Sequence, residues 1–205
     1  MTPDYWTRAT AHLAANDPVL ARVIADYPAE RLERRGDAFE TLARAIVGQQ
    51  VSVKSAQAVW SRIELAVGEI DAGAVAAGAD DALLGCGLSR QKLGYLNDLA
   101  GRFLSGALVP SRWADQDDDE VSAELMAVKG IGRWTADMFL IFNLLRPDVL
   151  PVADIGLQRA MGRHYGDGGK LDAGAIEIIA APWRPWRSVA TWYLWRSLDP
   201  IPVAY

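Results

Sequence analysis

The sequence predicts an all-α protein, and three observations support that class. Alanine, leucine and charged residues dominate a chain of 205 residues, of which 51% are apolar. Apolar residues recur at spacings of three and four, which is typical of helices with one buried face. Alternating apolar and polar runs joined by hairpin turns, the pattern of strands, are missing from the sequence. At this length the chain suits one compact unit or two small lobes.

Capping residues predict where the helices of the first half begin and end. Asp17 followed by Pro18 is typical of a helix N-terminus, and Asp37 with Glu40 forms a capping box. Residues 48–50, Gly-Gln-Gln, interrupt the helix that this box opens. Serine caps and glycine stops frame two longer helices, at Ser52, Gly68, Ser89 and Gly106. The expected helices are 18–25, 38–47, 53–67, 81–84 and 90–104.

Residues 125–154 are the stretch around which the second half is organised. They predict the end of one helix, a glycine hairpin at 128–132, a second helix, and an extended segment that delivers Asp154. The apolar face of the second helix has spacings of four, three and four, and comprises Trp134, Met138, Ile141 and Leu145. Arg146-Pro147 should end this helix. Further helices are expected at 155–164, after Asp172 and from Pro185.

The acidic run at 115–120 holds five acids in six residues and is expected to be a solvated loop before the next helix. The hairpin has two interpretations. It is a structural corner, which Gly-x-Gly alone favours, or a site where backbone amides at a helix N-terminus bind an anion.

Composition excludes several classes of protein. No apolar run approaches the roughly 18 residues that span a membrane, and the N-terminus lacks a signal pattern, so a cytoplasmic location is expected. The single cysteine, Cys86, excludes an internal disulfide and a cysteine-ligated iron–sulfur cluster, and is expected to be packed. The net charge of −5 argues against a strongly basic nucleic-acid binder. Residues 129–205, however, hold 9 Lys and Arg against 7 Asp and Glu, a net charge of +2.

Four segments, in this order, resemble the helix-hairpin-helix DNA glycosylase superfamily. They are AIVGQQVSVKSAQAVWSRI (45–63), LLGCGLSRQKLGYLNDLA (83–100), LMAVKGIGRWTADM (125–138) and WRPWRSVATWYLWR (183–196). Asp154 stands 20 residues after Trp134, as in the alkylation-repair branch, the DNA-3-methyladenine glycosylases. The resemblance implies two helical lobes, 37–132 and 1–36 with 133–205, with the active-site cleft between them.

The resemblance implies that Asp154 is the catalytic residue. Taken alone, Asp154 more often reads as the N-cap of the following helix, and the two roles are compatible. A fixed carboxylate stabilises the oxocarbenium-like sugar and can activate a water molecule. A purine alkylated at N3 or N7 is already cationic, so its departure needs no second, acidic carboxyl group. We expect Asp137, within the hairpin helix, to be structural.

Trp134 predicts the type of reaction. Bifunctional members of the superfamily have a lysine at this position, whose amine forms a Schiff base with the sugar. We therefore expect base excision without strand cleavage. Trp134, Trp195 and Met138 match the positions of the base pocket, where an aromatic face attracts a cationic base. Relatives often have tyrosine in place of Met138.

The resemblance also assigns contacts to DNA and to a cation. Gln50 corresponds to a residue that fills the gap left by a flipped base, although a structural helix-end glutamine is equally consistent with the sequence. The remaining residues expected to bind DNA are Lys129, Gly130, Gly132 and Thr135. The main-chain carbonyls of Met126, Val128 and Ile131 are expected to bind a monovalent cation, Na⁺ or K⁺. No organic cofactor is expected.

These observations predict a monofunctional glycosylase that removes alkylated purines from damaged double-stranded DNA during base excision repair. It is expected to be a monomer that acts on the DNA of the nucleoid and does not associate with a membrane. Two alternatives remain open from the sequence. One is a glycosylase for a neutral, deaminated or oxidised purine, which would need a proton donor to the base. The other is a non-enzymatic helix-hairpin-helix module that only binds the DNA backbone.

Overall fold

The computed structural model describes residues 2–34 and 36–198. Every regular element in these ranges is helical, with twelve α-helices and two short 3-10 helices, which confirms the predicted all-α class. None of these helices is both long and apolar enough to cross a membrane. The chain divides into two compact units, a terminal unit (2–34 and 140–198) and a central unit (36–139). The division falls after Phe139, seven residues beyond the boundary placed at 132 from the sequence.

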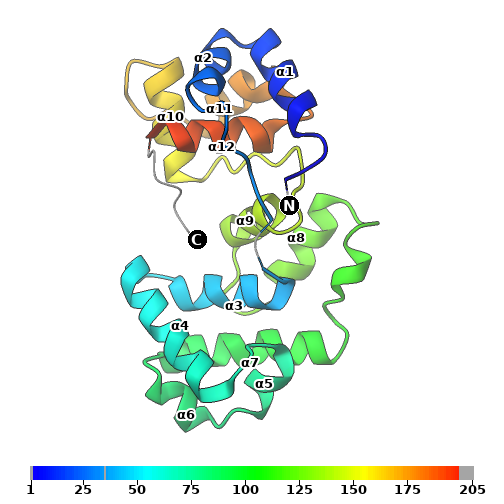
Figure 1. Cartoon of the computed structure of the whole chain (residues 1–205), viewed down its shortest axis with the longest axis vertical. Coiled ribbons are helices and arrows are strands. Elements are labelled where there is room, and N and C mark those ends of the chain that lie inside the picture. The colour runs from blue at the N-terminus through cyan, green and yellow to red at the C-terminus, as the bar shows by residue number, and fades with distance from the viewer. Residues whose placement is uncertain (1, 35, 199–205) are drawn as a thin grey trace. The chain divides into compact units, whose positions relative to one another are not determined.

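The central unit is built around two helices, α3 and α7, that pack against each other. α3 (Ala38–Gly48) also packs against α4 (Val53–Val67), and α7 (Arg90–Leu104) also packs against α5 (Ala72–Ala77) and α6 (Asp80–Gly85) (Figure 1). The unit continues through η1 (Pro110–Arg112) and α8 (Asp118–Met126). An edge-to-face series of aromatic rings fills its core, with centroids 5.3–6.4 Å apart, and comprises Phe39, Phe103, Trp113 and Phe139.

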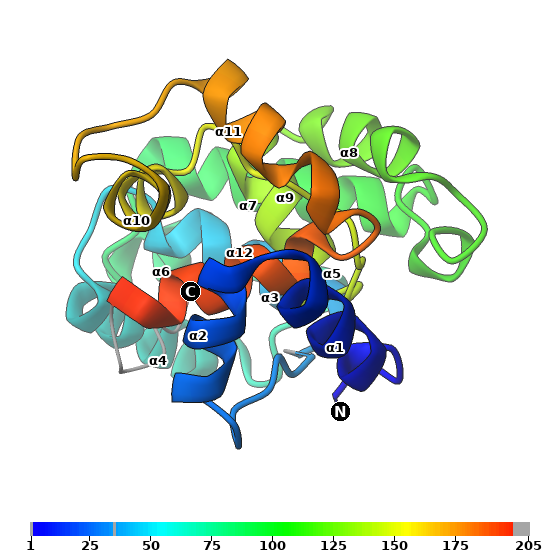
Figure 2. The same ribbon diagram turned by 90° about the horizontal axis from the view of Figure 1, so that it is seen from above.

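The terminal unit is organised around α12 (Arg187–Leu198), whose residues from Ser188 to Leu194 are all buried. α12 packs against α1 (Trp6–Asn16), α2 (Pro18–Asp26) and α10 (Ile155–Tyr165) (Figure 2). The unit also contains α11 (Ala173–Ala180) and η2 (Ala181–Trp183).

Asp17 joins three parts of the terminal unit. Its Oδ1 caps α2 by accepting the amides of Val19 and Leu20, as its position before Pro18 predicts. Its Oδ2 accepts the Tyr165 hydroxyl and the Trp183 indole N–H, both at 2.8 Å. This buried carboxylate is therefore satisfied from three segments that are far apart in the sequence.

α9 (Arg133–Phe142) begins in the central unit and ends in the terminal unit. The sequence placed its end at Leu145, but Leu145 adopts a left-handed conformation with φ of 56°. The Arg146 amide then donates to the Leu140 carbonyl at 2.8 Å and closes the helix end. The helix therefore stops earlier than its apolar spacing predicts.

One further prediction about elements needs correction, and two helices were not predicted. The acidic run is not a solvated loop throughout, because residues 118–120 form the first turn of α8, and Asp117 and Glu120 form its capping box. Helices α1 and α5 were not predicted. α5 is only six residues long and contains Gly73, so its helical pattern is weak, although Asp71 caps it.

Candidate active site

Asp154 lies where the non-helical segment 147–154 meets α10. The sequence predicted an extended segment here, but the chain turns at 147–148 and at 152–153, where the Asp154 amide donates to the Pro151 carbonyl at 2.8 Å. Its side chain is the N-cap of that helix, with Oδ1 accepting the Leu157 amide at 2.6 Å. The same oxygen accepts the indole N–H of Trp195, from α12, at 2.8 Å. Asp154 is only 6% exposed. The cap predicted from the sequence is therefore present, and a second donor from another helix fixes the carboxylate further.

Trp195 was predicted to form a wall of the base pocket, and the structure gives its polar end a definite partner, Asp154. Its ring stacks on Phe142, the last residue of α9, with centroids 5.7 Å apart and planes 16° apart. Gly156, in the first turn of α10, allows this approach. A Cβ atom there would lie 3.1 Å from Cδ1 of Trp195 and 3.0 Å from Oδ1 of Asp154. Sequence reasoning did not identify Gly156, because its role depends on a residue 39 positions away.

The three predicted residues of α9, Trp134, Thr135 and Met138, differ in how exposed their side chains are. Trp134 is 40% exposed, whereas Met138 and Thr135 are buried. Asp137 is also buried, and its Oδ1 accepts a hydrogen bond from Nε of Arg133 at 2.8 Å. Burial raises the pKa of Asp137, and the bond from Arg133 opposes that increase. Because Asp137 already has a cationic partner, these contacts are consistent with its structural role.

Gly130 and Gly132 of the hairpin differ in what surrounds them. Gly130 has φ of 84°, and a Cβ atom at Gly130 would overlap the ring of Tyr95 on α7. No heavy atom lies within 4 Å of a Cβ atom built on Gly132. Gly130 is therefore required by the protein itself, whereas the space beside Gly132 is open.

The hairpin amides are less available than the sequence suggested. The Lys129 amide donates to Oδ2 of Asp98 at 2.9 Å, and the Ile131 amide donates to the Val128 carbonyl at 3.1 Å. Burial raises the pKa of Asp98, but the bonds from the Lys129 amide and from Arg102 outweigh it and lower the pKa overall. Within the described ranges, the amides of Gly130 and Gly132 have no assigned intramolecular acceptor.

The turn after α3 also contacts the hairpin. Gln49 donates from Nε2 to the Gly130 carbonyl at 2.8 Å. Lys92 donates from Nζ to the Val47 carbonyl at 2.8 Å and so satisfies the end of α3. Gln50 is exposed and left-handed, with φ of 57°, a conformation that costs roughly 1–3 kcal/mol in a residue with a side chain. Sequence reasoning selected Gln50 and missed Gln49, since nothing in a Gln-Gln pair shows which side chain faces the hairpin.

The carbonyls predicted to bind a cation lie at the end of α8 and in the hairpin. Met126 is the last residue of α8, and no hydrogen bond to its carbonyl is found in the described part of the chain. Helix C-terminal carbonyls carry partial negative charge, which suits a cation. The Val128 carbonyl accepts the Ile131 amide but keeps a second lone pair. The donor set therefore fits a hard monovalent ion. Cys86 is buried, as predicted.

The structure places the predicted residues in two groups, one in each unit. Asp154 and Trp195 are in direct contact in the terminal unit. Residues of the turn after α3, the hairpin and α9 form the group in the central unit, namely Gln50, Met126, Val128, Lys129, Gly130, Ile131, Gly132, Trp134, Thr135 and Met138.

Comparison with known proteins gives a consistent family. A model described as the HhH-GPD superfamily base excision DNA repair protein matches residues 43–187. DNA-3-methyladenine glycosylase 1 of Schizosaccharomyces pombe is 30% identical over 201 residues, covering 93% of this chain and 87% of that protein. A second relative, from Bacillus subtilis, is 35% identical over 111 residues. This match covers 54% of this chain and only 39% of the relative.

Solved structures agree with the sequence comparison. A DNA-3-methyladenine glycosidase from Bacillus halodurans superimposes with a TM-score of 0.86 at 33% identity, covering 97% of this chain and 92% of that one. The S. pombe 3-methyladenine DNA glycosylase in complex with abasic DNA has a TM-score of 0.79 at 26% identity, covering 96% of this chain and 100% of that one.

Proposed function

The chain belongs to the HhH-GPD superfamily of base excision DNA repair proteins, and on that premise we propose that it is a DNA-3-methyladenine glycosylase. It hydrolyses the N-glycosidic bond of alkylated purines in duplex DNA. The observation that carries this function is the buried carboxylate of Asp154, held by one amide and one indole N–H. Asp17 is held in a similar way in a structural role, so what distinguishes Asp154 is its place 20 residues after Trp134, as in the alkylation-repair branch.

The proposed reaction balances with one carboxylate. The bond between C1′ and the purine nitrogen breaks, and the base leaves with the electron pair, which neutralises its positive charge. The sugar becomes oxocarbenium-like, and the negative charge of Asp154 stabilises it. Water then adds its oxygen to C1′, and Asp154 takes the proton that the water loses.

We assign Trp134, Met138 and Trp195 to contact with the departing base. An aromatic face attracts a cationic base with about 0.5–2 kcal/mol, and Trp134 is 40% exposed. Trp134 has no amine and cannot form a Schiff base with the sugar. The proposed product is therefore an intact strand with an abasic site.

We propose that the hairpin and the turn after α3 bind the DNA. The amides of Gly130 and Gly132, the side chain of Lys129 and the first turn of α9 at Thr135 would meet phosphate. Gln50 would enter the duplex at the position of the flipped base. A monovalent cation on the carbonyls of Met126, Val128 and Ile131 would add positive charge beside the same phosphate.

We further propose that the protein acts as a monomer in the cytoplasm, where it meets nucleoid DNA, and uses no organic cofactor and no iron–sulfur cluster. Its contacts to duplex and to base lie on residues of a single chain. Gel filtration with light scattering, alone and with a damaged duplex, tests the stoichiometry of one protein per lesion.

A comparison of substrates tests the proposed function. The protein is incubated with methylated duplex DNA and with duplexes that contain a neutral hypoxanthine or 8-oxoguanine, and released bases are separated by chromatography. We expect release of 3-methyladenine and little release of the neutral bases, because a cationic base leaves without being protonated, whereas a neutral base needs a proton donor. Preferred release of a neutral base would favour the alternative glycosylase, and no release with retained DNA binding would favour the binding module.

A further inference from the structure

We propose that Asp148 and Arg187 form a positioning pair that sets the location of the catalytic carboxylate of Asp154. Neither residue was assigned a role from the sequence. The pair lies at the start of the non-helical segment 147–154, and Asp154 lies at its end. The proposal rests on the proposed function, since it concerns the residue that would carry out the reaction.

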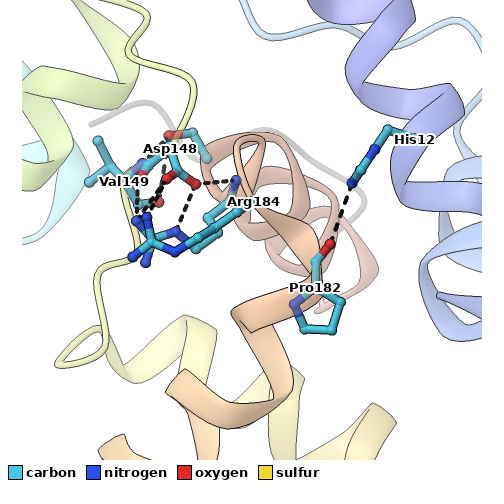
Figure 3. Close-up of polar contacts among 7 residues, drawn as sticks. His12, Asp148, Val149, Pro182 and Arg184 are labelled. Atoms are coloured by element: carbon cyan, nitrogen blue, oxygen red, sulfur yellow. Dashed lines mark hydrogen bonds and ion pairs between the residues drawn. The ribbon is translucent and has the colours of Figure 1, made fainter. Parts of the chain in front are cut away.

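Arg187, the first residue of α12, surrounds Asp148 with donors. Figure 3 shows Asp148 with Val149 and Arg184 beside it. Nε of Arg187 donates to Oδ1 of Asp148 at 2.7 Å and Nη2 donates to Oδ2 at 2.9 Å, the bidentate geometry that orients both groups. Nη2 also donates to the Asp148 carbonyl at 2.8 Å, and the Arg187 amide donates to Oδ1 at 3.3 Å. The Asp148 and Arg187 side chains are 21% and 17% exposed, so water screens this pair only in part.

Two hydrogen bonds with Ser188 hold the backbone on either side of Asp148. The Ser188 amide donates to the Pro147 carbonyl at 3.0 Å, and the Val149 amide donates to Oγ of Ser188 at 2.9 Å. Ser188 is completely buried. Residues 147–149 are therefore held on both sides of Asp148 by the first turn of α12.

The same helix holds the far end of the segment. Trp195, seven residues after Ser188 on α12, donates to Oδ1 of Asp154. At 1.5 Å per residue, about 10 Å of rigid helix separates the two attachment points. Between them, Nε2 of Gln158 donates to the Val152 carbonyl at 2.7 Å. α12 thus fixes both ends of the segment, and a shift at Asp148 would be transmitted to Asp154.

Arg184 supplies a matched control, because it contacts the same carboxylate from the outside. Its Nη1 donates to Oδ2 of Asp148 at 2.9 Å, but its side chain is 62% exposed. In the described part of the chain, no hydrogen bond joins Arg184 to the backbone of residues 147–149. Loss of Arg184 leaves the bidentate contact of Arg187 in place. If only the charge of Asp148 mattered, loss of either arginine would have a similar effect.

The experiment compares the full-length variants Asp148→Asn, Arg187→Lys and Arg184→Gln. We measure single-turnover excision from methylated duplex, affinity for an undamaged duplex, and hydrogen exchange of the Val149 amide. For Asp148→Asn we expect excision about 10- to 100-fold slower, since misplacement by about 1 Å costs up to that factor. DNA affinity should stay within about twofold of wild type, and exchange at Val149 should be faster. Arg187→Lys keeps the charge but loses the planar fork and should fall between wild type and Asp148→Asn, whereas Arg184→Gln should behave as wild type.

A double-mutant cycle with Trp195→Phe separates positioning from general destabilisation. If the pair acts through Asp154, the two substitutions should be coupled, and their rate losses should not multiply. Wild-type excision in Asp148→Asn with accelerated exchange at Val149 would overturn the proposal. The proposal would also be overturned if Asp148→Asn lowered the excision rate and the DNA affinity by the same factor. Should Asp148→Asn fail to fold, Arg187→Lys provides the same comparison. If the wild-type protein excised no base, the proposed function would fail, while exchange at Val149 would still report whether the pair holds the segment.

Discussion

One oxygen atom, Oδ1 of Asp154, links the start of α10 to α12 through two hydrogen bonds. The structural role of an N-cap and the proposed catalytic role therefore belong to the same carboxylate. The cap orients the group, and the indole of Trp195 adds a donor that depends on the tertiary fold. Catalysis by Asp154 should consequently be sensitive to Trp195 even if Trp195 never touched the base.

Trp195→Phe keeps an aromatic ring that can stack on Phe142 and removes the five-membered ring with its N–H donor. A hydrogen bond to a charged group contributes roughly 1.5–3 kcal/mol, so we expect single-turnover excision to slow by about 10- to 100-fold, with DNA affinity nearly unchanged. Trp186→Phe, at an indole that stacks on Tyr5, serves as the control. An unchanged excision rate in Trp195→Phe would mean that the indole does not orient Asp154 during the reaction.

Trp134 predicts the product. We expect an unbroken strand with an abasic site, which alkali or a separate nuclease then cleaves, and we expect no covalent adduct on treatment with borohydride, because Trp134 cannot form an imine. Denaturing gels of protein and DNA check both outcomes. Efficient borohydride trapping would contradict the monofunctional reaction, and Lys129→Gln would then test the nearest lysine.

Sequence reasoning identified residues that carry local signals and missed those that act through the fold. Asp154 precedes a helix, and Gly130 lies in a glycine hairpin, so both are visible in the sequence. Gln49 contacts Gly130 across 81 positions, and Arg187 contacts Asp148 across 39. Nothing local marks either contact, because each depends on how the helices pack.

At the scale of elements, the two hairpin glycines should respond differently to alanine. Gly130→Ala combines a φ of 84° with overlap on Tyr95, and we expect it to lower the free energy of unfolding by about 1–3 kcal/mol. Gly132→Ala adds a methyl group to open space, and we expect wild-type stability with weaker binding of undamaged duplex. Chemical denaturation and fluorescence anisotropy measure the two effects.

This comparison separates folding from DNA binding. Gly130→Ala alone could not separate folding from DNA binding, because any loss of affinity could follow from the displacement of Tyr95. Wild-type affinity in a fully folded Gly132→Ala protein would count against docking of the hairpin on phosphate.

The end of α8 should depend on a monovalent cation when DNA is bound. Replacing Na⁺ or K⁺ by tetramethylammonium at constant ionic strength should weaken duplex binding, since the larger ion cannot be coordinated by the carbonyls of Met126, Val128 and Ile131. The unfolding curve without DNA should be unaffected. Equal affinity in all three salts would contradict the cation site.

Element boundaries show where local signals compete with tertiary structure. The apolar spacing of α9 continues to Leu145, yet the chain leaves the helix after Phe142 because Leu145 is left-handed and Arg146 turns back to Leu140. The acidic residues 118–120 looked solvated and are indeed outside the core, but they begin α8 because Asp117 and Glu120 cap it. Capping chemistry was the more reliable signal in both halves of the chain.

At the scale of the whole molecule, composition predicted the helical class, and the division into units was harder to predict. α9 crosses the boundary at residue 139 without a break, and a continuous helix offers no turn or linker to mark a division. The net charge of −5 is also unusual for a protein that meets DNA. The proposed binding through backbone amides and a cation, together with the net charge of +2 in residues 129–205, would reconcile that acidity with DNA binding.

The most direct test of the central claim, that the carboxylate of Asp154 cleaves the glycosidic bond, is base release by Asp154→Asn. Asn keeps the shape and can still cap α10, but it removes the negative charge. With methylated duplex in single-turnover conditions, wild type and Asp137→Asn should both release 3-methyladenine. Asp154→Asn should release it at least about 10³-fold more slowly, while binding duplex as tightly as wild type or more tightly. Release by Asp154→Asn at close to the wild-type rate would contradict the claim.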